Sequence, residues 1–234
     1  MLVFIIALFV GSLINKIVFI LEQEEDIKYY LKYNQYYSKK IFAFSKLPII
    51  KHLLFKDDNN HLKNKKINRY IFIEILTASV ITSLYIIFPN KFMFFKYAIF
   101  ITMLLIIAII DYDTQYVYSI TTYIGIGIGI IFFIFEWYLF QILPIKYILG
   151  SLISFFIIGL ISYSTKAMGQ GDIEVAAFIG IFLGAENSIN FIAISFIVAA
   201  IISLILILFK KKTRKDYISF APSLAISAYF ILIS

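Results

Sequence analysis

The fold class is decided by long apolar stretches such as residues 92–110, which read FMFFKYAIFITMLLIIAII. The only charged residue in this stretch is Lys96, and its length suits one helical crossing of the bilayer core, which takes about 20 residues. Seven other apolar stretches precede or follow it, and one of these is short and begins after a glycine-rich turn. We therefore predict an all-α, polytopic transmembrane helical bundle of about eight membrane segments, one of them short. The predicted segments are 2–21, 71–88, 92–110, 118–135, 146–163, 173–185, 189–209 and 217–233.

The composition supports this prediction and excludes other classes of protein. Of the 234 residues, 62% are hydrophobic and 15% are charged, and the mean hydropathy is +0.92. Soluble domains contain about 45–50% apolar and about 25% charged residues, so a soluble enzyme is excluded. The abundance of Phe and Tyr excludes a disordered chain. The absence of cysteine excludes disulfide scaffolds and thiolate metal sites.

Lysine and arginine are distributed unevenly between the two sides of the predicted membrane protein. The side that holds segment 22–70 carries seventeen of them, and the opposite side carries Lys91, Lys96 and Lys146. The positive-inside rule therefore places segment 22–70 in the cytoplasm and both termini outside. Counting crossings puts three further connections on the cytoplasmic side: 111–117, 164–172 and 210–216.

The chain divides into three predicted parts: a first transmembrane helix at 1–21, a basic cytoplasmic insert at 22–70 and a transmembrane core at 71–234. We expect the first helix to be retained, because no basic stretch precedes its apolar run and no small-x-small cleavage site follows it. The insert has eleven basic and six acidic residues, and apolar residues between 42 and 55 suit the membrane interface. The lipid bilayer is thus an expected partner. Nucleic acid is not, because the basic residues lie between apolar runs rather than on one face.

Carboxylates near the hydrocarbon core are the candidate functional residues, because a charge placed there costs a few kcal/mol or more. Asp111 ends the apolar run at 106–110, and Asp172 begins the short segment directly after GQG at 169–171. The predicted topology puts both aspartates at the cytoplasmic boundary of the membrane. Two carboxylates that are far apart in the sequence are therefore expected at the same depth.

Two neighbouring carboxylates have a chemical use. They cannot both ionise easily, so they share a proton. The ionised one takes a proton from water while the protonated one donates to a carbonyl oxygen, as in aspartic proteases. The alternative is that Asp111 and Asp172 are helix caps, because a carboxylate at a helix N-terminus is stabilised by the helix dipole. Composition and position leave both alternatives open.

Other acidic residues after the insert carry weaker predictions. Glu136, Glu186 and Asp216 fall in predicted loops, where we expect them to be solvated. Asp113 follows the first aspartate by two residues, which suits a supporting hydrogen bond or a cap. Glu74 falls one turn inside a predicted membrane helix, where pairing with a nearby basic residue is the alternative to a functional role.

Six motifs, in order along the chain, favour a catalytic role for the two aspartates over helix capping. With them the sequence resembles the type IV prepilin peptidases, the leader peptidases and N-methyltransferases of pilus, type II secretion and competence systems. The IDYD motif is similar to the family's IDxD, and GQGD with the residues that follow it is similar to the family's GxGD segment. The six motifs are GSLIN at 11–15, KLPII at 46–50, RYIFIEILT at 69–77, IDYD at 110–113, GQGD at 169–172 and SFAPSLA at 219–225.

The resemblance implies an aspartic endopeptidase with Asp111 and Asp172 as the catalytic residues. Gly169, Gly171 and Asp113 are then supporting residues, and 71–234 is a transmembrane peptidase core. The implied substrates are prepilin-like membrane proteins, whose short basic leader is removed at the cytoplasmic face of a bacterial inner membrane. No cofactor is implied for proteolysis. Two readings stay open beside this one: presenilin-like intramembrane cleavage of other substrates, and a non-catalytic membrane scaffold or transporter.

The resemblance also implies a second reaction, methylation of the new N-terminus from S-adenosylmethionine, to which the Glu74 motif is linked. Family members commonly carry two CxxC pairs in the insert, which form a zinc site. This chain has no cysteine, and His52 and His61 stand in a Lys- and Asn-rich segment, so we predict no metal. A further departure is Glu174, where the family usually has Lys.

Overall fold

The computed structural model describes the backbone of residues 1–30, 61–141, 145–165, 168–210, 213 and 216–234, and no side chain between 22 and 67. The predicted interfacial part of the insert and His52 therefore lie outside the described residues. Every regular element in the described ranges is an α-helix, which confirms the predicted all-α bundle. The helices are α1 (Leu2–Tyr30), α4 (His61–Ile87), α5 (Lys91–Thr114), α6 (Ser119–Phe140), α7 (Ile145–Thr165), α8 (Gln170–Leu183), α9 (Ala185–Leu208) and α10 (Ala221–Ile233).

Six of these helices are long and apolar enough to cross a membrane: α1, α4, α5, α6, α7 and α9. The structure therefore describes a multi-pass membrane protein. The remaining two helices, α8 and α10, have 14 and 13 residues, which is short of a full crossing. The last predicted segment, 217–233, begins later as a helix, at Ala221. Pro222 explains this boundary, because proline is favoured in the first turn of a helix.

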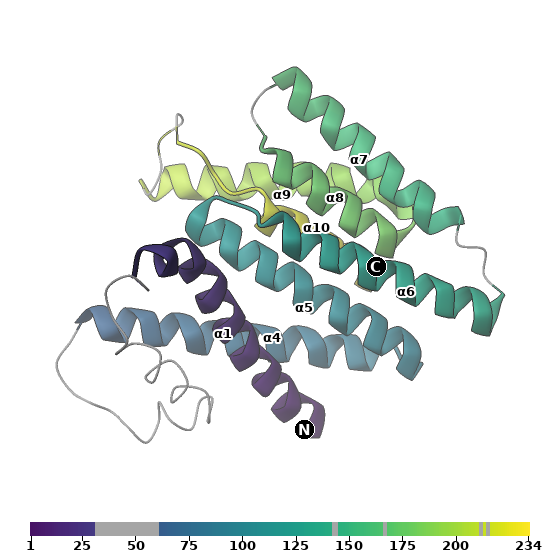
Figure 1. Cartoon of the computed structure of the whole chain (residues 1–234), viewed down its shortest axis with the longest axis horizontal. Coiled ribbons are helices and arrows are strands. Elements are labelled where there is room, and N and C mark those ends of the chain that lie inside the picture. The colour runs from purple at the N-terminus through teal and green to yellow at the C-terminus, as the bar shows by residue number, and fades with distance from the viewer. Residues whose placement is uncertain (31–60, 142–144, 166–167, 211–212, 214–215) are drawn as a thin grey trace. The chain divides into compact units, whose positions relative to one another are not determined.

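Contacts divide the chain into two compact units, Met1–Asn90 and Lys91–Ser234. In the first unit, α1 and α4 lie against each other (Figure 1). Gly11 allows the close approach, because a Cβ atom there would lie 2.7 Å from the Cα atom of Glu74. The Asn15 side-chain amide donates a hydrogen bond to the carbonyl oxygen of Tyr70 at 3.1 Å. A glycine and a polar side chain thus join two apolar helices, as is common in membranes.

In the second unit, the short helix α8 lies among α6, α7, α9 and α10 (Figure 1). All its residues from Val175 to Leu183 are buried. The ring of Phe182 stacks on that of Phe100 from α5, with 4.4 Å between centroids. Against α7 the approach is backbone to backbone, because a Cβ atom at Gly180 would lie 2.6 Å from the carbonyl carbon of Gly150. A helix too short to span is tolerated here because protein surrounds it.

The structure corrects the prediction for Glu136. Helix α6 continues through Phe140, so Glu136 lies inside a membrane span and is fully buried, and the prediction of a solvated loop residue is wrong. Its carboxylate oxygen Oε1 is 2.7 Å from the Nζ atom of Lys96 on α5, which is itself 2% exposed. The ion pair explains why both side chains can be buried, because each charge compensates the other. Glu186 lies in the first turn of α9 and Asp216 precedes α10, and both are exposed.

Candidate active site

Asp111 lies in the last turn of α5 and is 5% exposed. Its Oδ2 atom accepts a hydrogen bond from the backbone N–H of Ala221 at 2.9 Å. Ala221 is the first residue of α10, where backbone N–H groups have no partner inside the helix. The side chain of Gln115 adds a second link, since its amide donates to the carbonyl oxygen of Tyr217 at 3.2 Å. The end of α5 is thus tied to the start of α10.

Asp172 lies in the first turn of α8 and is 8% exposed. Its Oδ2 atom accepts a hydrogen bond from the backbone N–H of Gly169, the N-cap residue, at 3.2 Å. This is the backward-reaching half of a capping box. Ser162 of α7 holds the residue that precedes the N-cap of α8, because its hydroxyl donates to the carbonyl oxygen of Met168 at 3.0 Å.

The two aspartates are close enough to interact electrostatically. Asp172 lies outside the six membrane spans. Its burial first, and then the negative charge of Asp111, raise the pKa of its carboxyl to about 7, and the N–H of Gly169 opposes the rise. A carboxyl with a pKa near 7 keeps its proton in weakly acidic to neutral conditions, so one proton is available to the pair.

Each aspartate uses its Oδ2 atom to cap a helix, and the backbone N–H of Phe220 also bonds to the Asp111 carboxylate. The caps predicted as an alternative to catalysis therefore exist, at α8 and at α10. They leave room for catalysis at Asp172, because the described residues donate to its Oδ2 atom alone and its Oδ1 atom is left to bind water or substrate. The same N–H groups fix the orientation of both side chains, as a catalytic pair requires.

Residues 98–204 match the model of the type IV leader peptidase family, and this match covers both aspartates. This region belongs to the type IV leader peptidase family. The predicted family is thereby confirmed, and with it a peptidase. No curated protein and no solved structure matches the chain significantly. Ala221, the partner of the first aspartate, lies beyond the part that matches the family.

The other predicted site residues differ in their surroundings. Gly169 is exposed, and its N–H binds Asp172. Gly171 packs against the connection between α5 and α6, because a Cβ atom there would lie 2.6 Å from the Cβ atom of Val117. Asp113 is exposed in the last turn of α5. Glu74 belongs to the first unit, on α4, and is 4% exposed.

Sequence reasoning missed two hydrogen-bond partners, one of Asp111 and one of Glu174. The first is the N–H of Ala221, although Pro222 was a signal, since proline is favoured in the first turn of a helix, where N–H groups have no partner inside the helix. The second is Tyr123 of α6, whose hydroxyl donates to Oε1 of Glu174 at 3.2 Å. No sequence pattern links Tyr123 to a residue so far along the chain.

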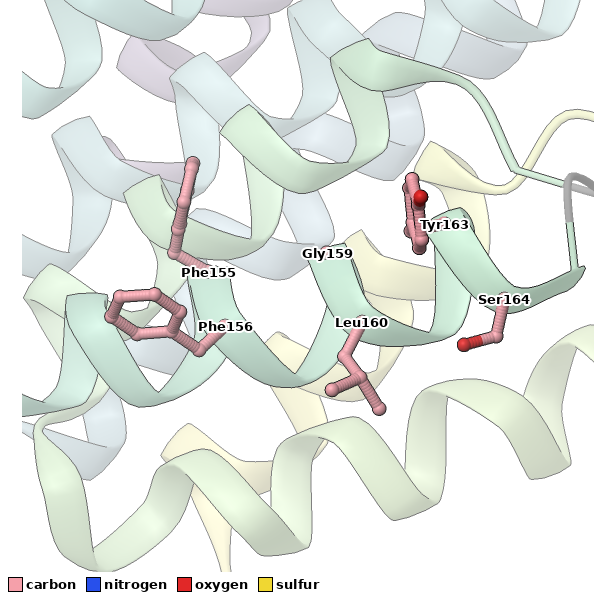
Figure 2. Close-up of a pocket in the computed structure, with 6 residues that line it drawn as sticks. All are labelled: Phe155, Phe156, Gly159, Leu160, Tyr163 and Ser164. Carbon is pink, nitrogen blue, oxygen red and sulfur yellow. The ribbon is translucent and has the colours of Figure 1, made fainter.

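The absence of a metal site stays a prediction from the sequence, which has no cysteine to supply thiolate ligands. No three His, Asp or Glu side chains gather within the described part of the chain. A cavity of about 390 Å³ is open along α7, and neither aspartate lines it (Figure 2). Its lining is mostly apolar and aromatic and belongs to a membrane span. The lining residues are Phe155, Phe156, Gly159, Leu160, Tyr163 and Ser164.

Proposed function

We propose that the protein is a membrane aspartic endopeptidase that removes the short basic leader of type IV prepilin-like precursors. The observation that carries the proposal is the pair of buried carboxylates, Asp111 and Asp172, held at the same end of the second unit. Family membership supports proteolysis. The excess of basic residues on the side of both aspartates supports a cytoplasmic active site in a bacterial inner membrane.

The mechanism uses one shared proton. The ionised aspartate takes a proton from a water molecule, and the water oxygen attacks the scissile carbonyl carbon. The protonated aspartate donates its proton to the carbonyl oxygen, which gives a neutral tetrahedral diol. When the diol collapses, a proton passes to the leaving amide nitrogen and the C–N bond breaks. The N–H groups of Ala221 and Gly169 hold the two carboxylates in place throughout.

Cleavage of a prepilin-like peptide by the purified protein in liposomes tests this proposal. Asp111→Asn and Asp172→Asn are the informative variants, because an amide oxygen still accepts the capping N–H while the side chain no longer titrates. Both variants should fold and lose cleavage by a factor of about 10³ or more. Asp216→Asn is the matched control, since Asp216 is exposed and bonds locally to the N–H of Thr213, and it should cleave as the wild type does.

The outcomes separate the alternatives. Retained cleavage in both aspartate variants would refute the catalytic pair and would leave helix capping as the role of both aspartates. If the folded wild type cleaved no prepilin-like peptide but cut other membrane helices, the substrate assignment would change to presenilin-like proteolysis. A wild type that cuts nothing would support the scaffold or transporter. With S-adenosylmethionine present, a product heavier by one methyl group would establish the second reaction in a chain without cysteines.

A further inference from the structure

Glu174 is a second carboxylate on the first turns of α8, two residues after Asp172. Its Oε1 atom accepts the hydroxyl of Tyr123 from α6 at 3.2 Å. Its Oε2 atom is buried and has no hydrogen-bond partner in the described part of the chain. Tyr123 itself is 60% exposed. A carboxylate with one inaccessible oxygen thus stands beside an exposed aromatic ring.

This arrangement favours the arrival of a positive charge. A buried polar atom without a hydrogen bond is costly, and more so when the group is charged. The hydroxyl of Tyr123 satisfies one oxygen only. The cap of α8 does not need Glu174, because Asp172 already supplies it. An ammonium or guanidinium group beside the exposed ring of Tyr123 would compensate the negative charge of the carboxylate and would also be attracted to the ring.

The position of Glu174 relative to the aspartate pair suits an extended peptide. Residues two apart in a helix point to nearly opposite sides, and a helix with its side chains is about 10–12 Å across. An extended chain advances about 3.3 Å per residue, so about three residues cover that width. The end of α8 is open to such a chain, because Gly169 and Gln170 are exposed and neither glycine beside Gln170 carries a side chain.

We propose that Glu174 and Tyr123 form the subsite that binds a positively charged side chain of the leader, about three residues from the bond that is cut. This inference rests on the proposed function and adds to it a determinant of substrate choice. Asp172 would act on the scissile carbonyl on one side of the first turn of α8, and Glu174 would hold the basic side chain on the other.

Pairs of peptides that differ in one leader residue test the subsite. One peptide has Lys two, three or four residues before the scissile bond, and its partner has Met, which is similar in length and uncharged. The readout is the ratio of kcat/KM for Lys over Met in liposomes. We expect the wild type to prefer Lys about tenfold at one of these positions, and Glu174→Gln to bring that ratio close to one.

Three variants support the interpretation of that ratio. Tyr123→Phe keeps the charge and should keep the preference for Lys. Glu174→Lys should reverse the preference, so that a peptide with Glu in place of Lys becomes the better substrate. Glu186→Gln is the matched control, because Glu186 is exposed in the first turn of α9 and should leave the ratio unchanged.

The two ways of failing are distinct. If Glu174→Gln cleaves the peptides with the same Lys preference as the wild type, the subsite is refuted while the peptidase stands. A role limited to packing α8 on α6 would change the thermal stability, or KM for both peptides alike, without changing the ratio, and this result also overturns the subsite. A wild type that cleaves neither peptide overturns the proposed function and the subsite together.

Discussion

The buried pair of Lys96 and Glu136 gives the sharpest prediction about stability. The two atoms that meet, Nζ and Oε1, are 2.7 Å apart, and the side chains are 2% and 0% exposed. The ammonium group also donates to the hydroxyl of Tyr147 at 3.4 Å and lies 4.4 Å from the centroid of its ring. Water has no access to the pair, so the loss of either charge leaves the other without compensation.

Replacing one member of the pair should therefore destabilise the second unit strongly. Removing one partner of a buried ion pair costs about 3–5 kcal/mol, because an unpaired charge stays behind. We expect this loss for Lys96→Met and for Glu136→Leu. In a unit of this size each kcal/mol lowers Tm by about 2–4 °C, so Tm should fall by about 6–20 °C. The double variant removes both charges and should lie within about 2 kcal/mol of the wild type.

Thermal unfolding in detergent measures these differences. The single Trp of the chain, Trp137, is adjacent to Glu136 and provides a fluorescence signal at the site, and circular dichroism follows the helices. The double-mutant cycle gives the coupling between the two side chains. Single variants within about 1 kcal/mol of the wild type, or a double variant as unstable as the sum of the singles, would refute the reasoning.

Three further predictions concern the site and the packing of α8. Because the pKa of Asp172 is raised to about 7, the native state binds more protons than the unfolded state between about pH 4 and 7. Stability should then fall as pH rises through that window, and it should fall more steeply in the wild type than in Asp172→Asn. Cleavage should decline above about pH 7, and profiles that are flat, or equal in the two proteins, would contradict this. Gly180→Ala forces a methyl group into the facing backbone and should cost about 2 kcal/mol or more in thermal unfolding, whereas Gly127→Ala, where nothing lies within 4 Å, should not destabilise. Gly171→Ala should reduce cleavage, and Val117→Gly in the same chain should restore it by removing the Cβ atom that the new methyl group would meet, which a cleavage assay on the single and double variants would decide.

The helices could be predicted from the sequence because the length and hydropathy of each stretch are properties of that stretch alone. Each apolar stretch must satisfy its own backbone hydrogen bonds in the bilayer, so it forms a helix wherever it is long enough. The family motifs also put both aspartates in the region where the structure brings them together. The prediction for Glu136 failed because its environment depends on Lys96, 40 residues earlier and on another helix.

Hydrogen bonds between residues on different helices could not be predicted from the sequence either, because they depend on residues far apart in the chain. The N–H of Ala221 is 110 residues from Asp111, and the hydroxyl of Tyr123 is 51 residues from Glu174. No periodic pattern or motif spacing in the sequence links the two residues of either pair. Such contacts depend on how helices rotate about their axes, which apolar composition determines only weakly when every face of a helix is apolar.

Helix α5 carries a polar contact near each of its ends, Lys96 with α6 and Asp111 with α10. The 15 residues between them correspond to about 22 Å of helix, against a hydrocarbon core of about 30 Å. The helix therefore fixes the distance along its axis between the Lys96–Glu136 pair and Asp111. Sliding α5 along its axis to suit a thicker or thinner bilayer would break both contacts at once. A change in bilayer thickness would thus have to be accommodated elsewhere than by a movement of α5 along its axis.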